Sequence, residues 1–279
     1  MKFAEMPYLR VDTEAVVAAL KELTQELKAA KSGEEQFEIH QKFYALRDEY
    51  NTTIQIAMIR SDVDTADEFY SEEKNYYNEV LPTINNQETE YRKALYYSPY
   101  REVLEEKIGK VAFKSMELEF KAMDEKLIPL MQEENALTTQ YDKLIASAKI
   151  DWEGEALNLS LLRPYMTHED REIRRKAHEK YSAFFQSKAE ELDEIYDKLV
   201  KNRTAQARLL GYENYVELGY YRMNRNSYGR EDVENFRRQI KEYFVPLAEK
   251  MHDKRRERLG LEKLSYIDEN MYFVDGNPK

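Results

Sequence analysis

The chain has 279 residues, long enough for a large core, and no cysteine, which excludes disulfide scaffolds, thiolate nucleophiles and cysteine-ligated metal sites. Its 43 Lys and Arg against 54 Asp and Glu give a formal charge of −11, which argues against nucleic acid or an anionic membrane as the main partner. The longest apolar runs fall far below the roughly 18 residues of a membrane span, and the first residues contain no apolar signal core. We therefore expect a cytoplasmic protein with no nucleic-acid and no membrane partner.

The first 145 residues have the periodicity of long helices. Only 8 glycines and 7 prolines interrupt the whole chain, and apolar residues recur every three or four positions. We expect Gly33 to end the first helix, and Pro82 and Pro129 to kink or interrupt later ones because proline cannot donate a backbone hydrogen bond. In chain order, the pattern predicts helices over 13–33, 34–60, 65–97 and 98–144.

Between 146 and 162 the period of the apolar residues changes from 3.6 to 2. Alternating apolar residues flank Glu153-Gly154-Glu155, a sequence that can form a turn, so this segment predicts a β-hairpin. The fold class is therefore all-α, mainly long antiparallel helices, with one small β-hairpin. We place the domain boundaries around this hairpin: an N-terminal helical region over 1–145, the hairpin and a connector over 146–166, and a second helical region over 167–279.

Helical periodicity returns after Pro164, where Thr167 is the expected cap of the next helix. Three more helices are expected, over 188–210, 214–221 and 231–259, the last of which contains Pro246. The terminal segment has no capped helix or other closing element. We therefore expect that the sequence is cut inside a larger protein.

The four histidines are the first candidates for a metal or general-base site. His168 and His178 are each followed by Glu, as in the zinc-protease motif H-E-x-x-H, but the second histidine is missing in both cases. A metal-dependent enzyme that uses His168 with Glu172 remains a minor alternative. His40 and His252 stand alone and are interpreted as solvated or capping residues. We thus predict no catalytic and no metal-ligating residue in this chain.

A cluster of tyrosines and arginines between 211 and 228 is the strongest candidate for binding. Tyrosine offers contact area at low entropic cost and arginine can hold a carboxylate, so the cluster suits a groove for an extended peptide. Packing between short helices is the alternative explanation, and it is the favoured one because the whole chain contains 22 tyrosines. The candidate substrate-binding residues are Tyr220, Tyr221, Arg222, Arg225 and Tyr228.

Several segments resemble oligoendopeptidase F, in the thimet-oligopeptidase family of zinc peptidases. They include, around the hairpin, Trp152–Glu155, Asn158–Ser160 and Leu162–Tyr165, and further along Arg175–Ala177, Tyr196–Arg203, Leu210–Tyr215, Leu218–Tyr220, Arg222–Met223, Phe236–Arg237 and Val245–Leu247. The resemblance implies a largely helical, clam-like enzyme with a deep channel for short peptides, in which the histidines of H-E-x-x-H and a downstream glutamate hold zinc. This sequence contains no H-E-x-x-H, so no catalytic residue carries over.

The resemblance predicts that the chain is the N-terminal part of an oligoendopeptidase F-like zinc metallopeptidase that hydrolyses short peptides. It would form one wall of the peptide channel, bind no zinc and be inactive alone. Its expected partners are short peptides and either the missing C-terminal catalytic half or a self-association partner. The alternative is a self-contained helical module that binds a peptide or protein without catalysis.

Overall fold

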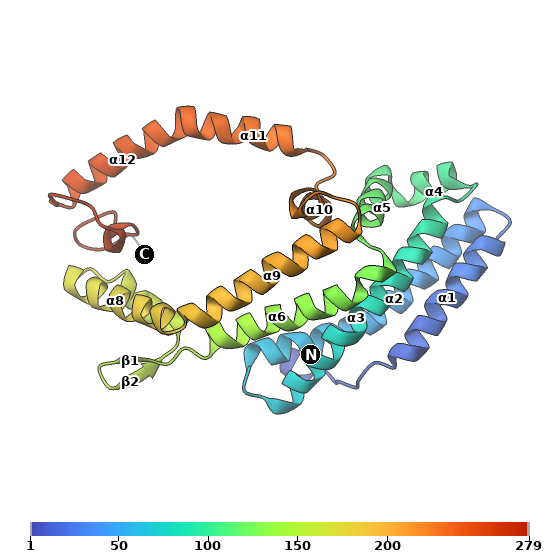
Figure 1. Cartoon of the computed structure of the whole chain (residues 1–279), viewed down its shortest axis with the longest axis horizontal. Coiled ribbons are helices and arrows are strands. Elements are labelled where there is room, and N and C mark those ends of the chain that lie inside the picture. The colour runs from blue at the N-terminus through green and yellow to red at the C-terminus, as the bar shows by residue number, and fades with distance from the viewer. Residues whose placement is uncertain (1, 278–279) are drawn as a thin grey trace. The chain divides into compact units, whose positions relative to one another are not determined.

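A computed structural model describes residues 2–277, and within them the chain is built mainly from helices with one two-stranded antiparallel sheet (Figure 1). This confirms the predicted fold class. The chain divides into two compact units. The first contains the residues up to Thr139 together with Asp197–Ser227, and the second contains Gln140–Tyr196 together with the residues from Tyr228 onward.

The α-helices, in chain order, are α1 (Thr13–Ala29), α2 (Gly33–Val63), α3 (Glu68–Tyr96), α4 (Arg101–Ile108), α5 (Lys110–Ala122), α6 (Ile128–Ala146), α7 (Leu159–Met166), α8 (Arg171–Ser187), α9 (Ala189–Leu209), α10 (Tyr215–Arg222), α11 (Arg230–Gln239) and α12 (Val245–Arg258). The short helices are η1 (Phe3–Glu5), η2 (Glu125–Leu127) and η4 (Tyr266–Asp268), and η3 (Ile240–Phe244) is a π-helical turn between α11 and α12. No helix within residues 2–277 is long and apolar enough to cross a membrane.

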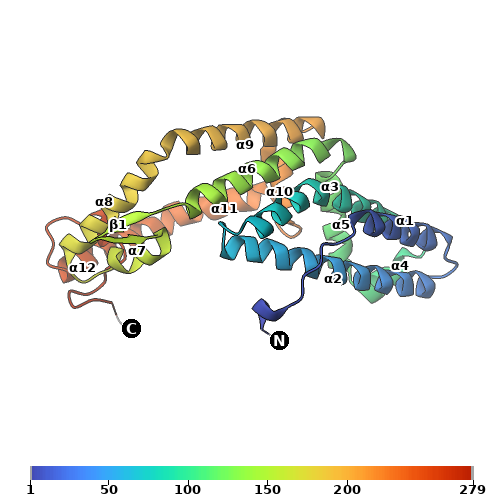
Figure 2. The same ribbon diagram turned by 90° about the horizontal axis from the view of Figure 1, so that it is seen from below.

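Helices α1, α2 and α3 form the main core of the first unit and lie side by side in both views (Figures 1 and 2). Each begins at a residue whose side chain accepts a backbone N–H of the first turn: Asp12, Ser32 and Asp67, at 3.0 to 3.1 Å. The rings of Phe43 and Tyr91 stack face to face across the α2–α3 interface, with centroids 4.1 Å apart. The apolar face predicted from the periodicity is thus buried between these helices.

Gly33 has a different role from the predicted one. The first helix already ends at Ala29, and Gly33 is the first residue of α2. A Cβ atom on Gly33 would lie 2.7 Å from Val103 on α4, closer than carbon atoms can approach. The position therefore serves close packing of two helices rather than helix termination.

The prediction of one helical stretch over 98–144 was wrong, because the structure divides it into α4, α5 and α6. The first break is at Gly109, whose φ of +105° is a conformation that side-chain-bearing residues rarely adopt. The second is at Asp124, whose carboxylate accepts the N–H of Lys126 at 3.1 Å. Pro129 lies in the first turn of α6, where its missing N–H costs nothing, whereas Pro82 lies inside α3.

In the second unit the hairpin is shorter than predicted. Strands β1 (Ile150–Trp152) and β2 (Glu155–Leu157) pair antiparallel around Glu153 and Gly154, both at positive φ, as a type I′ turn requires. The residues from Leu159 onward belong to α7, because the side chain of Asn158 accepts the N–H of Leu161 at 2.8 Å and starts a helix. The prediction of a strand beyond Leu157 was wrong, because Leu159 and Leu161 alternate in sequence but lie in α7.

Helix α8 is fixed to the short helix η4 by a buried carboxylate. The expected cap, Thr167, instead ends α7, and the cap of α8 is Asp170. Arg171 and Arg174 both donate to Asp268, which has no exposed surface, at 2.8 to 3.0 Å. Burial acts to raise the pKa of Asp268, but these hydrogen bonds outweigh it and lower the pKa to about 2.

Helices α11 and α12 run as one continuous curved rod through the π-helical turn η3, which ends two residues before Pro246 (Figure 1). Nearly every side chain from α11 to the middle of α12 is exposed to solvent. Large apolar residues are spaced three or four positions apart along the rod: Phe236, Ile240, Phe244, Leu247 and Met251, each 37 to 62% exposed. We call these five residues the apolar stripe.

Candidate functional site

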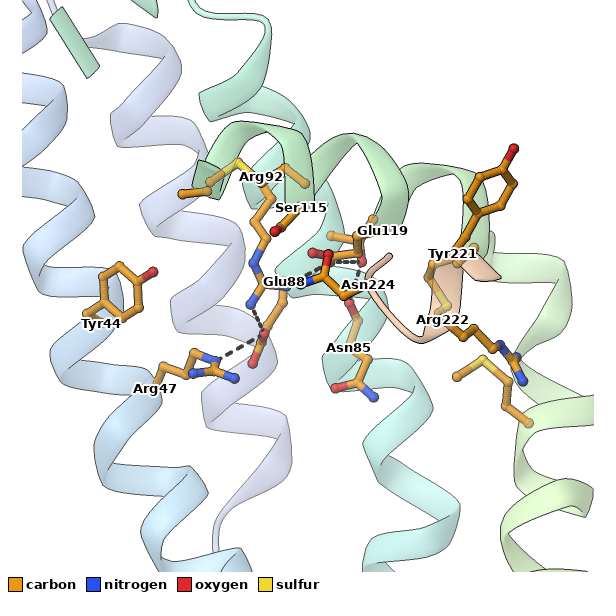
Figure 3. A pocket seen from close by; sticks show the side chains of 16 residues that line it. Tyr44, Arg47, Asn85, Glu88, Arg92, Ser115, Glu119, Tyr221, Arg222 and Asn224 are labelled. Carbon is orange, nitrogen blue, oxygen red and sulfur yellow. Dashed lines mark hydrogen bonds and ion pairs between the residues drawn. The ribbon is translucent and has the colours of Figure 1, made fainter. Parts of the chain in front are cut away.

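A cavity of about 600 Å³ opens in the first unit (Figure 3). We call it the Arg47 cavity. Its polar and aromatic lining residues are Tyr44 and Arg47 from α2, Asn85, Glu88, Thr89 and Arg92 from α3, Ser115 and Glu119 from α5, Tyr221 and Arg222 from α10, and Asn224 beyond α10. Its volume lies within the range of small-ligand pockets, which is about 300 to 1,000 Å³.

The floor of the Arg47 cavity is a set of matched charges. Glu88, with 8% of its side chain exposed, accepts from Arg47 Nε at 3.3 Å, from Arg92 and from the Tyr50 hydroxyl. Arg92 also donates to Glu119 at 2.7 Å. Burial acts to lower the pKa of Arg92, but Glu119 and Glu88 raise it above its usual value. The ion pairs among these four groups connect α2, α3 and α5.

The walls of the cavity contain methionine side chains and one asparagine in a left-handed backbone conformation. Met116, Met123 and Met131 line the cavity beside the charged floor. Asn224 has a φ of +51°, in the left-handed region where asparagine is one of the few tolerated residues. Figure 3 places Arg47 and Asn224 on opposite sides of Glu88.

The predicted binding residue Arg222 takes part in a second polar network, which is formed with Glu134 on α6 and Gln206 on α9. Its guanidinium donates to Glu134 at 2.9 Å and to Gln206, and Arg203 donates to the same carboxylate at 2.7 Å. Burial acts to raise the pKa of Glu134, yet the hydrogen bonds from Arg203, Gln206 and Arg222 lower it. The charge of Arg222 is therefore already neutralised by the protein.

The five predicted binding residues are only partly brought together. Tyr221 and Arg222 both line the Arg47 cavity, and a hydrogen bond to Glu217 together with burial raises the pKa of Tyr221 to about 12. Arg225 instead stacks on the ring of Tyr220, with its guanidinium 4.3 Å from the ring centre. Tyr228 begins the stretch of the second unit that leads into α11, and is 49% exposed. Their role in substrate binding stays a prediction.

His40 is part of the core of the first unit. His40, interpreted from the sequence as solvated or capping, is only 2% exposed, and that interpretation was wrong. It lies beside the stacked rings of Phe43 and Tyr91, with its ring centre 5.9 and 6.0 Å from theirs, and burial with the nearby charge of Arg92 lowers its pKa to about 4. Because the surrounding rings come from α2 and from α3, about 50 residues apart in the chain, no local pattern could reveal this.

The alternative metal pair does not form a site. His168 uses Nδ1 to accept the backbone N–H of Asp170 at 3.0 Å, and Glu172 pairs with Arg175 at 3.1 Å. In the part of the chain that the structure describes, no three His, Asp or Glu side chains are grouped so that they could hold a metal ion.

Sequence reasoning missed the residues that form the floor of the cavity. Arg47, Glu88 and Arg92 lie more than 125 residues before Tyr221, and nothing local connects them to it. Their only signal is helical spacing, three residues from Tyr44 to Arg47 and four from Glu88 to Arg92, which is common on any helix surface.

Comparisons with known proteins agree across nearly the whole chain. Residues 3–123 match the Peptidase M3 N-terminal domain, and residues 164–274 match Peptidase family M3. No curated protein matches the chain. Among solved structures, PZ peptidase A with an inhibitor is 43% identical over 99% of this chain, with a TM-score of 0.96. A protein described as an oligoendopeptidase F from Bacillus anthracis strain Ames is 40% identical over 100% of the chain, with the same TM-score.

The lengths of these relatives differ from that of this chain. The chain spans about half of each, 49% of PZ peptidase A and 51% of the Bacillus anthracis protein. A third structure, described as an oligoendopeptidase F, is 41% identical and is covered over 49% of its length. The likeness is therefore to one half of a longer peptidase.

Proposed function

Because this chain belongs to the peptidase M3 family, we propose that it supplies the N-terminal portion of an oligoendopeptidase F-like zinc peptidase and forms one wall of its peptide channel. One observation carries this proposal: a TM-score of 0.96 at 40 to 43% identity over the whole chain, which covers only about half of each relative. The apolar stripe supports it, because a rod with so much exposed apolar surface is typical of an interface.

The division of labour follows from the residues present. Zinc supplies a Lewis acid and an activated water in such peptidases, and this sequence contains no H-E-x-x-H that could hold the ion. No step of the reaction is therefore assigned to side chains of this chain. Its contribution would be to bind and orient a short peptide and to exclude water from one side of the channel.

Reconstitution tests the proposal. The chain is mixed with a polypeptide that corresponds to the half of PZ peptidase A that this chain does not span, and zinc and a quenched fluorescent peptide are added. We expect turnover only from the mixture, blocked by a chelator. Turnover by the chain alone with zinc, or no turnover once gel filtration has established association, would contradict the proposal.

Two charge variants locate the interface in the same assay. Leu247→Glu places a charge in the apolar stripe and should lower the association and turnover of the mixture at least about tenfold, which corresponds to about 1.4 kcal/mol. Lys241→Glu, at an exposed position outside the stripe, is the matched control and should change neither. Both positions are exposed, so the fold of the chain itself should persist.

A further inference from the structure

The Arg47 cavity contains polar groups that the protein does not use internally. Arg47 has 35% of its side chain exposed, and within residues 2–277 its hydrogen bonding is limited to Nε. The side-chain amides of Asn85 and Asn224 and the hydroxyl of Tyr44 are exposed and have no hydrogen-bond partner among the described residues. Polar groups in a concave site that lack internal partners are the usual contacts of a ligand.

The Glu88 carboxylate of the floor, by contrast, is fully used. Glu88 accepts from Arg47 and Arg92 through Oε2 and from Tyr50 through Oε1, whereas Glu119 accepts from Thr89 and Arg92 through Oε1 alone, at 2.7 Å each. A cationic ligand would have to displace an arginine to reach Glu88. The available positive charge is the outer edge of the Arg47 guanidinium, whose two Nη atoms can hold a carboxylate in a bidentate pair.

We propose that the Arg47 cavity binds the carboxyl-terminal end of a short peptide. The terminal carboxylate pairs with the Nη atoms of Arg47, and the amides of Asn85 and Asn224 donate to and accept from the peptide backbone. The last side chain of the peptide packs against the methionine wall, which has no charge and adapts to shape. This assignment rests on the proposed function for the class of ligand, and adds a site that recognises one end of the peptide.

The first test compares one peptide with two different ends. A tripeptide with a fluorescent label on its N-terminus is titrated with the chain in two forms, with a free and with an amidated C-terminus, and anisotropy is measured. We expect the free acid to bind at least about tenfold more tightly, because a hydrogen-bonded charge pair contributes on that scale. Equal affinity of the two forms, or no saturable binding of either, would overturn the proposal.

Variants on α2 assign the preference to one side chain. Arg47→Gln should remove the preference for the free acid and weaken its binding about tenfold. Lys42→Gln removes a positive charge from the same helix, outside the cavity, where Lys42 is 64% exposed, and should change nothing. If Arg47→Gln binds both forms as the parent chain does, the carboxylate pairs elsewhere and the proposal fails.

A second variant keeps the test decisive if loss of the Arg47–Glu88 pair unfolds the chain. Asn224→Gly removes the amide and relieves the positive φ, so the fold should be retained. Free and amidated peptides should both bind several-fold more weakly, with the preference between them unchanged; unaltered affinity would overturn the assignment. Binding needs neither zinc nor the second half, so a failure here is distinct from a failure of the reconstitution experiment.

Discussion

The two units of this chain differ in how far their helices are covered by the chain itself. In the first unit, α1, α2 and α3 enclose fully buried aromatic and aliphatic side chains such as Phe43, Tyr77 and Tyr91. In the second, a small core around Trp152 and Leu162 packs against α7 and α8, while the rod of α11 and α12 leaves its apolar stripe in solvent. The first unit is stabilised by its own core, and the second contains surface that is typical of an interface with another chain segment.

The largest expected effect is on the free energy of unfolding, and it should separate two Phe→Ala variants, one in each unit. Phe43→Ala should lower the free energy of unfolding by about 3 to 5 kcal/mol, because it opens a cavity in the core of the first unit. Phe236→Ala, in the apolar stripe, should change it by less than about 0.5 kcal/mol, because that side chain is 62% exposed. Urea denaturation followed by circular dichroism measures both, and similar losses would contradict the contrast between the units.

The stability of the first unit should depend on pH, because its core contains the buried histidine His40. Folding holds the pKa of His40 near 4, below the 6.5 that is usual for a solvated histidine. Between these values the unfolded chain binds a proton that the folded chain does not, so stability falls as pH drops from about 6.5 to about 4. The expected loss is about 3 kcal/mol, and little of it should appear above pH 6.5, because a histidine in the unfolded chain is mostly neutral there.

Two glutamine variants isolate that contribution from other groups. Burial also lowers the pKa of His178 in the second unit, so the parent chain contains more than one source of the slope. His40→Gln should remove most of the slope of stability against pH, whereas His252→Gln, at an exposed position, should leave it intact. A slope that survives His40→Gln would mean that His40 is not held neutral.

The smallest effect should be the same in both units. Ser32→Ala removes the cap of α2 in the first unit, and Asn158→Ala removes the cap of α7 in the second. Each should cost about 1 kcal/mol, because a cap acts on its own first turn and needs no distant contact. Denaturation midpoints compare the two; a much larger cost in one unit would show that its cap also supports tertiary packing.

Much of the fold could be predicted from local pattern, because a helix needs only its own periodicity and its ends. The expected helix over 188–210 is α9 to within one residue, and that over 214–221 is α10 to within one residue at each end. The errors arose where one residue decides between neighbouring conformations. Gly109 interrupts a periodic stretch through its positive φ. Asn158 caps a helix at a place where alternating apolar residues had predicted a strand.

The candidate site was less predictable, because its parts come from distant helices. Tyr221 and Arg222 were found in a dense local cluster of tyrosines and arginines. Arg47 and Glu88 carry no such signal, since a charged residue on a long helix is usually solvated. Whether two helix faces meet is set by packing of the whole unit, which a single sequence does not encode at any one position.

The methionine wall of the Arg47 cavity has a consequence for selectivity. Met116 and Met123 are nearly buried at its edge, and unbranched thioether chains change rotamer at little cost. Such a wall discriminates poorly among aliphatic and aromatic groups of different outline. Such a site would select peptides by the position of their C-terminus and would accept many different side chains at the last residue.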